Sequence, residues 1–301
     1  MDAVAPISES ANQAPLGEVI AEARRMLEQA GIDSAGQEAF WIVEYVLRLP
    51  AHHVVTERDR LLSHAELVAA RGLVERRVGR EPLQYILGTQ EFCGLEFHVS
   101  PAVLIPRPET ELLVEYVVQR IPVERQATIV DACTGSGCIA VAIARLRPRA
   151  RVIATDLSNP SLDIARQNAT CHVVSERITW LEGDLLGPLA DKGLEGCIDV
   201  IVSNPPYISE ADWATLQPEV QRFEPRDALV AGPLGTQLHE RLLREAGRYL
   251  SPGGALIMEI GAGQARDMRR IVDQISGYRF HRLVYDAAGL ERLVIVERLG
   301  T

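Results

Sequence analysis

Short apolar segments alternate with amphipathic ones between residues 128 and 296. Runs rich in β-branched residues predict strands at residues 128–132, 151–155, 178–181, 198–203, 255–260, 278–284 and 292–296. Helical periodicity lies between most of them, at residues 137–146, 159–170, 236–250 and 264–276. This alternation predicts a mainly parallel sheet with helices on both faces. The turn at residues 286–290 is too short for a parallel crossover, so we expect the final strand to run antiparallel.

The sequence before this alternation has a helical pattern. Apolar residues recur at helical spacing from residue 15 onward, and Ser63 with Glu66 has the form of a capping box. Residues 15–88 are therefore expected to form a small all-α bundle, and residues 1–14 a disordered start. Residues 89–107 contain two short strand-like runs joined at Gly94, which predict a β-hairpin linker to the domain at residues 108–301.

Composition excludes several classes of protein. The 301 residues carry a formal net charge of −10, so the surface as a whole would repel a phosphate backbone. The five cysteines are odd in number and include no C-x-x-C pair, which argues against a disulfide framework and a zinc site. The N-terminus resembles no secretory leader, and no window is apolar enough to span a membrane. We therefore expect a cytoplasmic protein without metal.

A glycine loop follows the first predicted strand of the sheet, at the edge where ligands bind in folds of this kind. Gly135 and Gly137 allow a tight turn and close approach of the backbone to a ligand. The spacing Gly135-x-Gly137-x-x-Ala140, with Asp156 about 21 residues later, also fits the dinucleotide-binding pattern. The loop alone leaves a nicotinamide or flavin enzyme open.

Three aspartates at successive strand ends separate these alternatives. Asp131 begins the glycine loop, Asp156 ends the second strand, and Asp184 follows the third. A cationic nucleoside can use one carboxylate near its positive charge, one on the ribose diol and one on the adenine amine, whereas Asp131 would repel a pyrophosphate. Each aspartate alone also fits a turn or a cap, but together they favour S-adenosylmethionine.

The fourth strand leads into Asn204-Pro205-Pro206-Tyr207. Neither proline can donate an N–H, so the strand ladder must stop there. Proline also holds the preceding residue extended, which directs the carbonyl oxygens of Asn204 and Pro205 out of the sheet edge. These acceptors beside an aromatic ring suit an amide or an exocyclic amine. A stiff strand exit is the alternative when the four residues are taken alone.

Taken together, these motifs resemble a class I S-adenosylmethionine-dependent methyltransferase acting on nitrogen. Within that class, the helical bundle, residues 82–88 and Leu104-Ile105-Pro106-Arg107-Pro108-Glu109-Thr110-Glu111 are similar to protein-(glutamine-N5) methyltransferases of the HemK/PrmC type. The resemblance covers residues 15–298. It implies a Rossmann-like, seven-stranded sheet with an antiparallel last strand, and an N-terminal bundle that docks the substrate. It further implies methylation of the glutamine in the Gly-Gly-Gln loop of class-1 peptide chain release factors.

The resemblance also implies the roles of individual residues. The expected cofactor contacts are Asp131, Cys133, Thr134, Gly135, Ser136, Gly137, Asp156, Asp184, Leu185 and Asn204. The expected catalytic and substrate-binding residues are Asn204, Pro205, Pro206 and Tyr207, with Arg107 also on the substrate side. Cys133 stands where the family more often has glycine, so the first turn of the loop must tolerate a side chain. Leu185 stands where an aromatic residue can stack on adenine, so we expect cofactor binding to be weaker or differently packed.

The expected mechanism follows from the chemistry of an amide, whose nitrogen is a poor nucleophile. The Asn204 side-chain oxygen and the Pro205 backbone oxygen can hold both N–H bonds and turn the lone pair toward the sulfonium methyl group of S-adenosylmethionine. Tyr207 is expected to pack against the amide plane and to exclude water. The Arg107 segment is expected to form a lid, with Arg107 and Glu111 as supporting contacts.

Two later segments carry weaker predictions. Residues 224–229 resemble the substrate-side loop of the family but fit a surface turn equally well. Glu259 and Arg292 lie in late strands and are predicted to form a buried ion pair.

Three alternatives remain open from the sequence. An adenine-N6 DNA methyltransferase can carry a similar Asn-Pro-Pro-Tyr stretch, but it would need a basic groove. A glutamine methyltransferase of a ribosomal protein is suggested by residues 92–97. A regulator that binds S-adenosylmethionine without catalysis is opposed by the intact Asn204–Tyr207 stretch. We expect a monomer that acts on a protein and contacts neither nucleic acid nor a membrane.

Overall fold

The computed structural model describes residues 13–300 and divides into two units, with the boundary between Leu87 and Gly88. Most of the start that was expected to be disordered, residues 1–12, lies outside the described residues. Ala14 was included in that expectation, yet it belongs to the short strand β1 (Ala14–Pro15), which pairs with β2 (Leu61–Leu62). This pairing gives the backbone of Ala14 a hydrogen-bonding partner, which the sequence pattern did not reveal.

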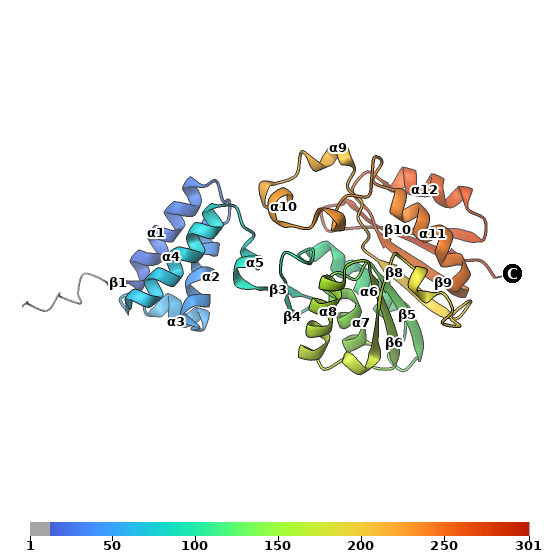
Figure 1. Cartoon of the computed structure of the whole chain (residues 1–301), viewed down its shortest axis with the longest axis horizontal. Helices are drawn as coiled ribbons and strands as arrows, with labels where there is room; N and C mark the ends of the chain where they lie inside the picture. The colour runs from blue at the N-terminus through green and yellow to red at the C-terminus, as the bar shows by residue number, and fades with distance from the viewer. Residues whose placement is uncertain (1–12, 301) are drawn as a thin grey trace, which may run out of the picture. The chain divides into compact units, whose positions relative to one another are not determined.

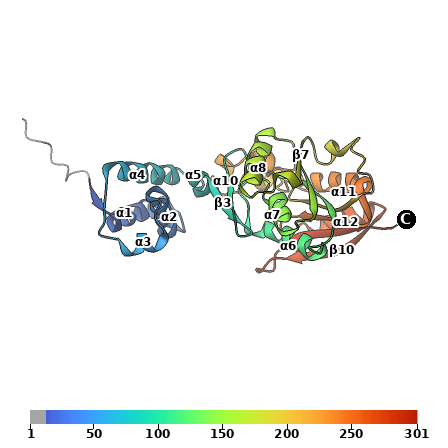
Figure 2. The same cartoon turned by 90° about the horizontal axis from the view of Figure 1, so that it is seen from below.

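The first unit is helical, as the periodicity predicted. Its helices are α1 (Leu16–Gln29), α2 (Ala35–Leu47), α3 (Ala51–Thr56), α4 (His64–Val78) and α5 (Leu83–Leu87). Helices α1, α2 and α4 pack against one another (Figure 1 and Figure 2), with Leu27, Ile42 and Val74 buried between them. The capping box is confirmed at the start of α4, where Glu66 accepts from the Ser63 backbone N–H at 2.7 Å and the Ser63 hydroxyl accepts from the Glu66 N–H.

The second unit begins with the predicted hairpin. Strands β3 (Thr89–Phe92) and β4 (Leu95–His98) pair antiparallel through a two-residue turn, in which Cys93 and Gly94 both have positive φ, 52° and 71°. This is the conformation of the tight hairpin turn that matches the twist of the strands. Phe92 and Phe97 are buried in the core of the second unit. The hairpin that we expected to link the two units is therefore part of the second one.

Seven strands form the sheet of the second unit. They are β5 (Ala127–Ala132), β6 (Ala150–Asp156), β7 (Ile178–Glu182), β8 (Ile198–Ser203), β9 (Leu250–Glu259), β10 (Tyr278–Tyr285) and β11 (Glu291–Arg298). Their order is β10-β11-β9-β8-β5-β6-β7, and β11 runs antiparallel to both of its neighbours. The strand order reverses between β5 and β8, whose carboxyl ends carry the glycine loop and Asn204. A doubly wound sheet binds its ligand at such a point.

Helices cover both faces of this sheet (Figure 1). Helices α6 (Glu111–Arg120), α7 (Cys138–Leu146) and α8 (Asn159–Cys171) contribute to the core on one face, and α11 (Gln237–Tyr249) and α12 (Ala265–Gln274) to the core on the other. A long connection follows β8 and contains the short helices α9 (Glu210–Trp213) and α10 (Pro218–Phe223). Within residues 13–300, no helix combines the length and the apolar character that crossing a membrane requires.

Candidate active site

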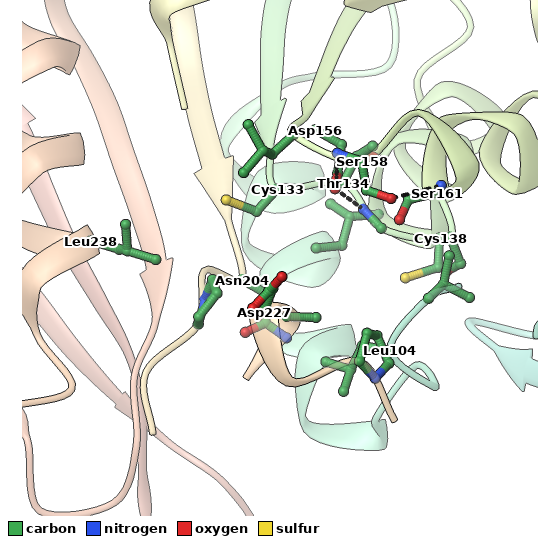
Figure 3. A pocket seen from close by; sticks show the side chains of 18 of the residues that line it. Leu104, Cys133, Thr134, Cys138, Asp156, Ser158, Ser161, Asn204, Asp227 and Leu238 are labelled. Atoms are coloured by element: carbon green, nitrogen blue, oxygen red, sulfur yellow. Dashed lines mark hydrogen bonds between the residues drawn. The ribbon is translucent and has the colours of Figure 1, made fainter. Parts of the chain in front are cut away.

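A cavity of about 490 Å³ opens at the carboxyl ends of the central strands. Figure 3 shows Cys133, Asp156 and Asn204 around it, each at or just after the end of its strand. Ten of the residues predicted from the sequence line the cavity: Cys133, Thr134, Gly135, Ser136, Asp156, Asp184, Leu185, Asn204, Pro206 and Arg107. The topology therefore brings the glycine loop, the carboxylates of Asp156 and Asp184, and the side-chain amide of Asn204 to one cavity.

Asp131 lies beneath this cavity and does not line it. Its side chain is fully buried, and its Oδ2 atom accepts from the Thr134 hydroxyl at 2.6 Å and from the Ala140 N–H at 3.1 Å. Burial raises the pKa of the Asp131 carboxyl to about 7, and these hydrogen bonds oppose the rise. Asp131 thus holds the glycine loop to the first turn of α7 through Oδ2, and its contact with the cofactor stays a prediction.

The glycine loop owes its shape to three residues with positive φ. Gly135 (53°) has open space where a side chain would begin, whereas a Cβ on Gly137 (78°) would lie 2.8 Å from the Cβ of Ala165. Gly137 is therefore needed for the packing of the loop against α8, and it does not line the cavity. Cys133 has a φ of 60°, so the first turn does hold a side chain in a region that favours glycine.

A buried asparagine, which the sequence did not point to, fixes the same loop from the other side. Asn168 on α8 donates to the Ser136 carbonyl at 2.8 Å, and its Oδ1 accepts from the His98 N–H at 2.7 Å. The glycine loop and the hairpin are thus tied to one amide. An asparagine inside a helical pattern gave no signal for this role, because both partners lie far from it in sequence.

Asp156 ends β6 with both carboxylate oxygens turned to backbone donors. Oδ2 accepts from the Gly135 N–H at 2.8 Å, and Oδ1 accepts from the Ser158 N–H at 2.9 Å. Burial raises the pKa of Asp156, while these two hydrogen bonds favour the ionised form. A carboxylate held in this way at a cavity wall keeps lone pairs on both oxygens for the two hydroxyls of a ribose.

Asp184 and Leu185 follow β7 at the same edge of the sheet. The Asp184 carboxylate is paired with Arg241 on α11 at 2.6 Å, and Arg241 also lines the cavity. Leu185 is buried with a φ of 46°, and its carbonyl accepts from the Thr155 hydroxyl at 2.7 Å. Sequence reasoning missed Arg241, which lies 57 residues from Asp184 on a different element.

Asn204 and Tyr207 are joined through two buried side chains from other elements. The Asn204 Nδ2 atom donates to the Thr110 Oγ1 atom at 3.2 Å, and the Thr110 hydroxyl donates to Glu259 Oε2 at 2.8 Å. The Tyr207 hydroxyl donates to Glu259 Oε1 at 3.2 Å. Pro205 and Tyr207 do not line the cavity, so of the predicted substrate residues on this stretch only Asn204 and Pro206 do.

Glu259 therefore has partners other than the one we predicted. The expected ion pair with Arg292 is wrong: Arg292 pairs with Asp286 at 2.7 Å and with Glu109 at 3.4 Å. Glu259 is only 1% exposed, and burial raises the pKa of its carboxyl to about 7. The Glu259 carboxylate accepts hydrogen bonds from two neutral hydroxyl groups instead of pairing with the Arg292 guanidinium.

Arg107 reaches the cavity from the segment before α6, where it forms an ion pair with Glu224. The Glu224 carboxylate is buried and also accepts from the Ile105 N–H at 3.2 Å. Residues 224–229 are thus tied to the Arg107 segment, and Pro225, Asp227 and Ala228 line the cavity. Glu111 lies elsewhere, because its carboxylate accepts from the Cys93 N–H at 2.7 Å and so holds the hairpin turn.

Comparison with known proteins agrees with this geometry. Residues 18–88 match the family described as PrmC N-terminal domain, and residues 108–221 match the one described as Methyltransferase small domain. The structure of a 16S rRNA methyltransferase of T. thermophilus has a TM-score of 0.51 and 18% identity, over 70% of this chain and 49% of that one, and it supports the class I methyltransferase fold.

Curated relatives match over nearly the whole chain. A release factor glutamine methyltransferase of Geobacter sulfurreducens is 43% identical over 90% of this chain and 92% of its own length. Another, of Nitratidesulfovibrio vulgaris, is 39% identical over 96% of this chain and 97% of its own. With both parts of the chain matched and a methyltransferase sheet carrying the site, the chain belongs to the family of release factor glutamine methyltransferases.

Proposed function

We propose that this enzyme transfers a methyl group from S-adenosylmethionine to the side-chain amide nitrogen (N5) of the glutamine in the Gly-Gly-Gln loop of class-1 peptide chain release factors. The observation that carries the proposal is the orientation of Asn204 at the cavity. Its amide nitrogen is engaged by Thr110, so its amide oxygen is available as an acceptor. The relatives that share most of the chain are named for this activity, which supports the release factor as substrate.

The residues around the cavity fit S-adenosylmethionine, which supplies a methyl group on a positively charged sulfur when bound. Asp156 offers acceptors for the ribose hydroxyls, and Gly135 leaves open space beside it. Asp184 and Leu185 provide a carboxylate and an apolar surface for the adenine side. Cys133 and Leu185 contribute a thiol and an aliphatic side chain to the lining of the cavity, and we expect the cofactor to pack differently against them than against a glycine and an aromatic residue.

The substrate residues act by positioning. The Asn204 Oδ1 atom and the Pro205 carbonyl accept the two N–H bonds of the glutamine amide at about 3 Å, which turns the nitrogen lone pair toward the methyl donor. Pro206 adds an apolar wall to the cavity and Tyr207 stiffens the stretch through its bond to Glu259. Positioning of this kind contributes several kcal/mol to lowering a barrier, on the order of the values known for oriented reactants. The methylated amide gives up its proton to water.

The remaining parts of the chain serve the protein substrate. We assign docking of the release factor to the helical unit, residues 15–88, and covering of the cavity to the Arg107 segment with residues 224–229. The net charge of −10 favours a protein partner over a nucleic acid or an anionic membrane. All five cysteines are free thiols, in keeping with an enzyme of the reducing cytoplasm.

Transfer of label from S-adenosylmethionine to purified release factor tests the proposal. We expect label in the wild-type factor and none in a factor whose loop glutamine is replaced by alanine. A ribosomal protein and duplex DNA serve as competing substrates. Equal label in both factors, or faster transfer to either competitor, would refute the release-factor assignment.

A further inference from the structure

Glu259 is a buried carboxyl that the proposed reaction does not use directly. It ends β9 beneath Asn204 and Tyr207, and both of its oxygens accept from hydroxyl groups, those of Thr110 and Tyr207. Thr110 is 2% exposed and connects Glu259 to the amide of Asn204. Three elements far apart in sequence thus converge on the side chain that faces the substrate.

We propose that Thr110 and Glu259 are positioning residues that decide which end of the Asn204 amide faces the glutamine; this inference rests on the function proposed above. The oxygen and nitrogen ends of an asparagine amide are nearly equal in size, so hydrogen bonds choose between its two orientations. An acceptor must face the glutamine NH₂ group. The wrong orientation would set two donors against each other.

The choice follows from counting donors. An ionised carboxylate only accepts, so the single hydroxyl proton of Thr110 is committed to Glu259. Thr110 can then offer only a lone pair to Asn204. The NH₂ end of Asn204 must turn to Thr110, as observed at 3.2 Å, and the oxygen end is left for the substrate.

Protonation of Glu259 removes this restriction. A carboxylic acid can donate to Thr110 Oγ1, which frees the threonine proton to bind the oxygen end of Asn204. The amide can then rotate and present its NH₂ group to the glutamine. The enzyme is therefore expected to lose activity as pH falls and Glu259 takes up a proton.

The groups around Glu259 make it the titrating member of this cluster. Glu109 and Thr110 face it from the turn just before α6, Tyr207 from the loop after β8, and Arg292 from β11. His239 on α11 contacts its backbone carbonyl at 2.7 Å. Burial raises the pKa of Glu259 to about 7, raises that of Tyr207, and lowers that of His239 to about 4. Of Glu259, Tyr207 and His239, only Glu259 therefore changes its charge near neutral pH.

Steady-state transfer to release factor, measured from about pH 5 to about pH 9, tests the inference. The wild-type kcat/KM is expected to fall below about pH 7, where Glu259 becomes protonated. Thr110→Val has the same shape without the hydroxyl and should lower kcat/KM by about 10-fold to 100-fold and abolish this acid limb, with the KM for S-adenosylmethionine unchanged. Thr110→Ser should restore both. Thr170→Val, on the exposed face of α8, is the matched control. A Thr110→Val enzyme with wild-type kcat/KM and the same acid limb would overturn the inference.

An NMR titration of the free enzyme gives a readout that does not depend on activity. The Glu259 carboxyl carbon, identified by its loss in Glu259→Gln, and the Asn204 side-chain amide, identified by its loss in Asn204→Ala, are followed with pH. The chemical shifts of both signals should change with the same pH midpoint in the wild type and in Thr110→Ser. In Thr110→Val the chemical shift of the Asn204 amide should not change with pH. A chemical shift of the Asn204 amide that does not change while Glu259 titrates in the wild type would refute the coupling between the two side chains. A wild-type enzyme without transfer to release factor would instead refute the proposed function, and the titration would still decide on the coupling.

Discussion

The two glycines of the cofactor loop should respond to the same substitution in different ways. Both have positive φ, so replacement by alanine costs about 1–2 kcal/mol of folding free energy at either position from the backbone alone. At Gly135 nothing lies within 4 Å of the added Cβ. At Gly137 the added Cβ lies 2.8 Å from the Cβ and 3.1 Å from the Cα of Ala165, and 3.2 Å from the Trp180 ring. The Ala165 Cα belongs to α8 and cannot yield as a flexible side chain can, so overpacking adds about 1–3 kcal/mol.

We therefore expect Gly137→Ala to lower the free energy of unfolding by about 2–5 kcal/mol, and Gly135→Ala by about 1–2 kcal/mol. Urea denaturation of the two variants measures this difference. Because Gly135 lines the cavity, Gly135→Ala should also bind S-adenosylhomocysteine at least about 10-fold more weakly in isothermal titration calorimetry. Equal stability of the two variants, or unchanged affinity in Gly135→Ala, would refute this description of the loop.

Three further predictions follow from buried or partly buried carboxylates. Asp156→Asn replaces one acceptor by a donor that faces a backbone N–H, so the affinity for S-adenosylmethionine measured by calorimetry should fall at least about 10-fold, whereas Asp163→Asn on the exposed surface of α8 should leave it unchanged. The pKa of Asp131 is about 7 in the folded chain against 3.8 for an aspartate in an unfolded chain, so the folded state binds the extra proton and wild-type stability should fall as pH rises between these values. Asp131→Asn should flatten this dependence, and an unchanged slope of stability against pH in urea unfolding would contradict the assignment. Glu224→Gln keeps an acceptor for the Ile105 N–H but removes the charge opposite Arg107, so it should cost about 1–3 kcal/mol of stability and raise the KM for release factor, and a KM equal to that of wild type would argue against a covering role for the Arg107 segment.

The sheet and its ligand edge were predictable because local patterns dictate them. Alternating strand and helix periods gave the layers, and the short turn at residues 286–290 gave the direction of the last strand. Glycines and prolines also have strong local consequences, which is why the loop at Gly135 and the strand exit at Asn204 could be recognised. Residues at successive carboxyl ends of parallel strands then had to meet at one edge.

The side chains that support the site were not predictable in the same way. Thr110 and Glu259 are 149 residues apart, and Asn204 and Thr110 are 94 apart, so no local pattern links them. Periodicity showed only that Glu259 lies in an apolar strand, and an ion pair with Arg292 was the simplest way to accommodate its charge. The structure offers two hydroxyls instead, and Arg292 is used by Asp286. The hydrogen bonds of Asp131 to Thr134 and Ala140, which anchor the glycine loop, were likewise not predicted from the sequence.

The central claim is that Asn204 holds the glutamine amide while other residues hold the cofactor. Methyl transfer by Asn204→Ala, mapped to the loop glutamine of the release factor by mass spectrometry, tests it most directly, with the affinity for S-adenosylmethionine measured on the same preparation. The account predicts loss of transfer by at least about 100-fold with the affinity retained within a few-fold. Transfer near the wild-type rate, to the same glutamine, would contradict it.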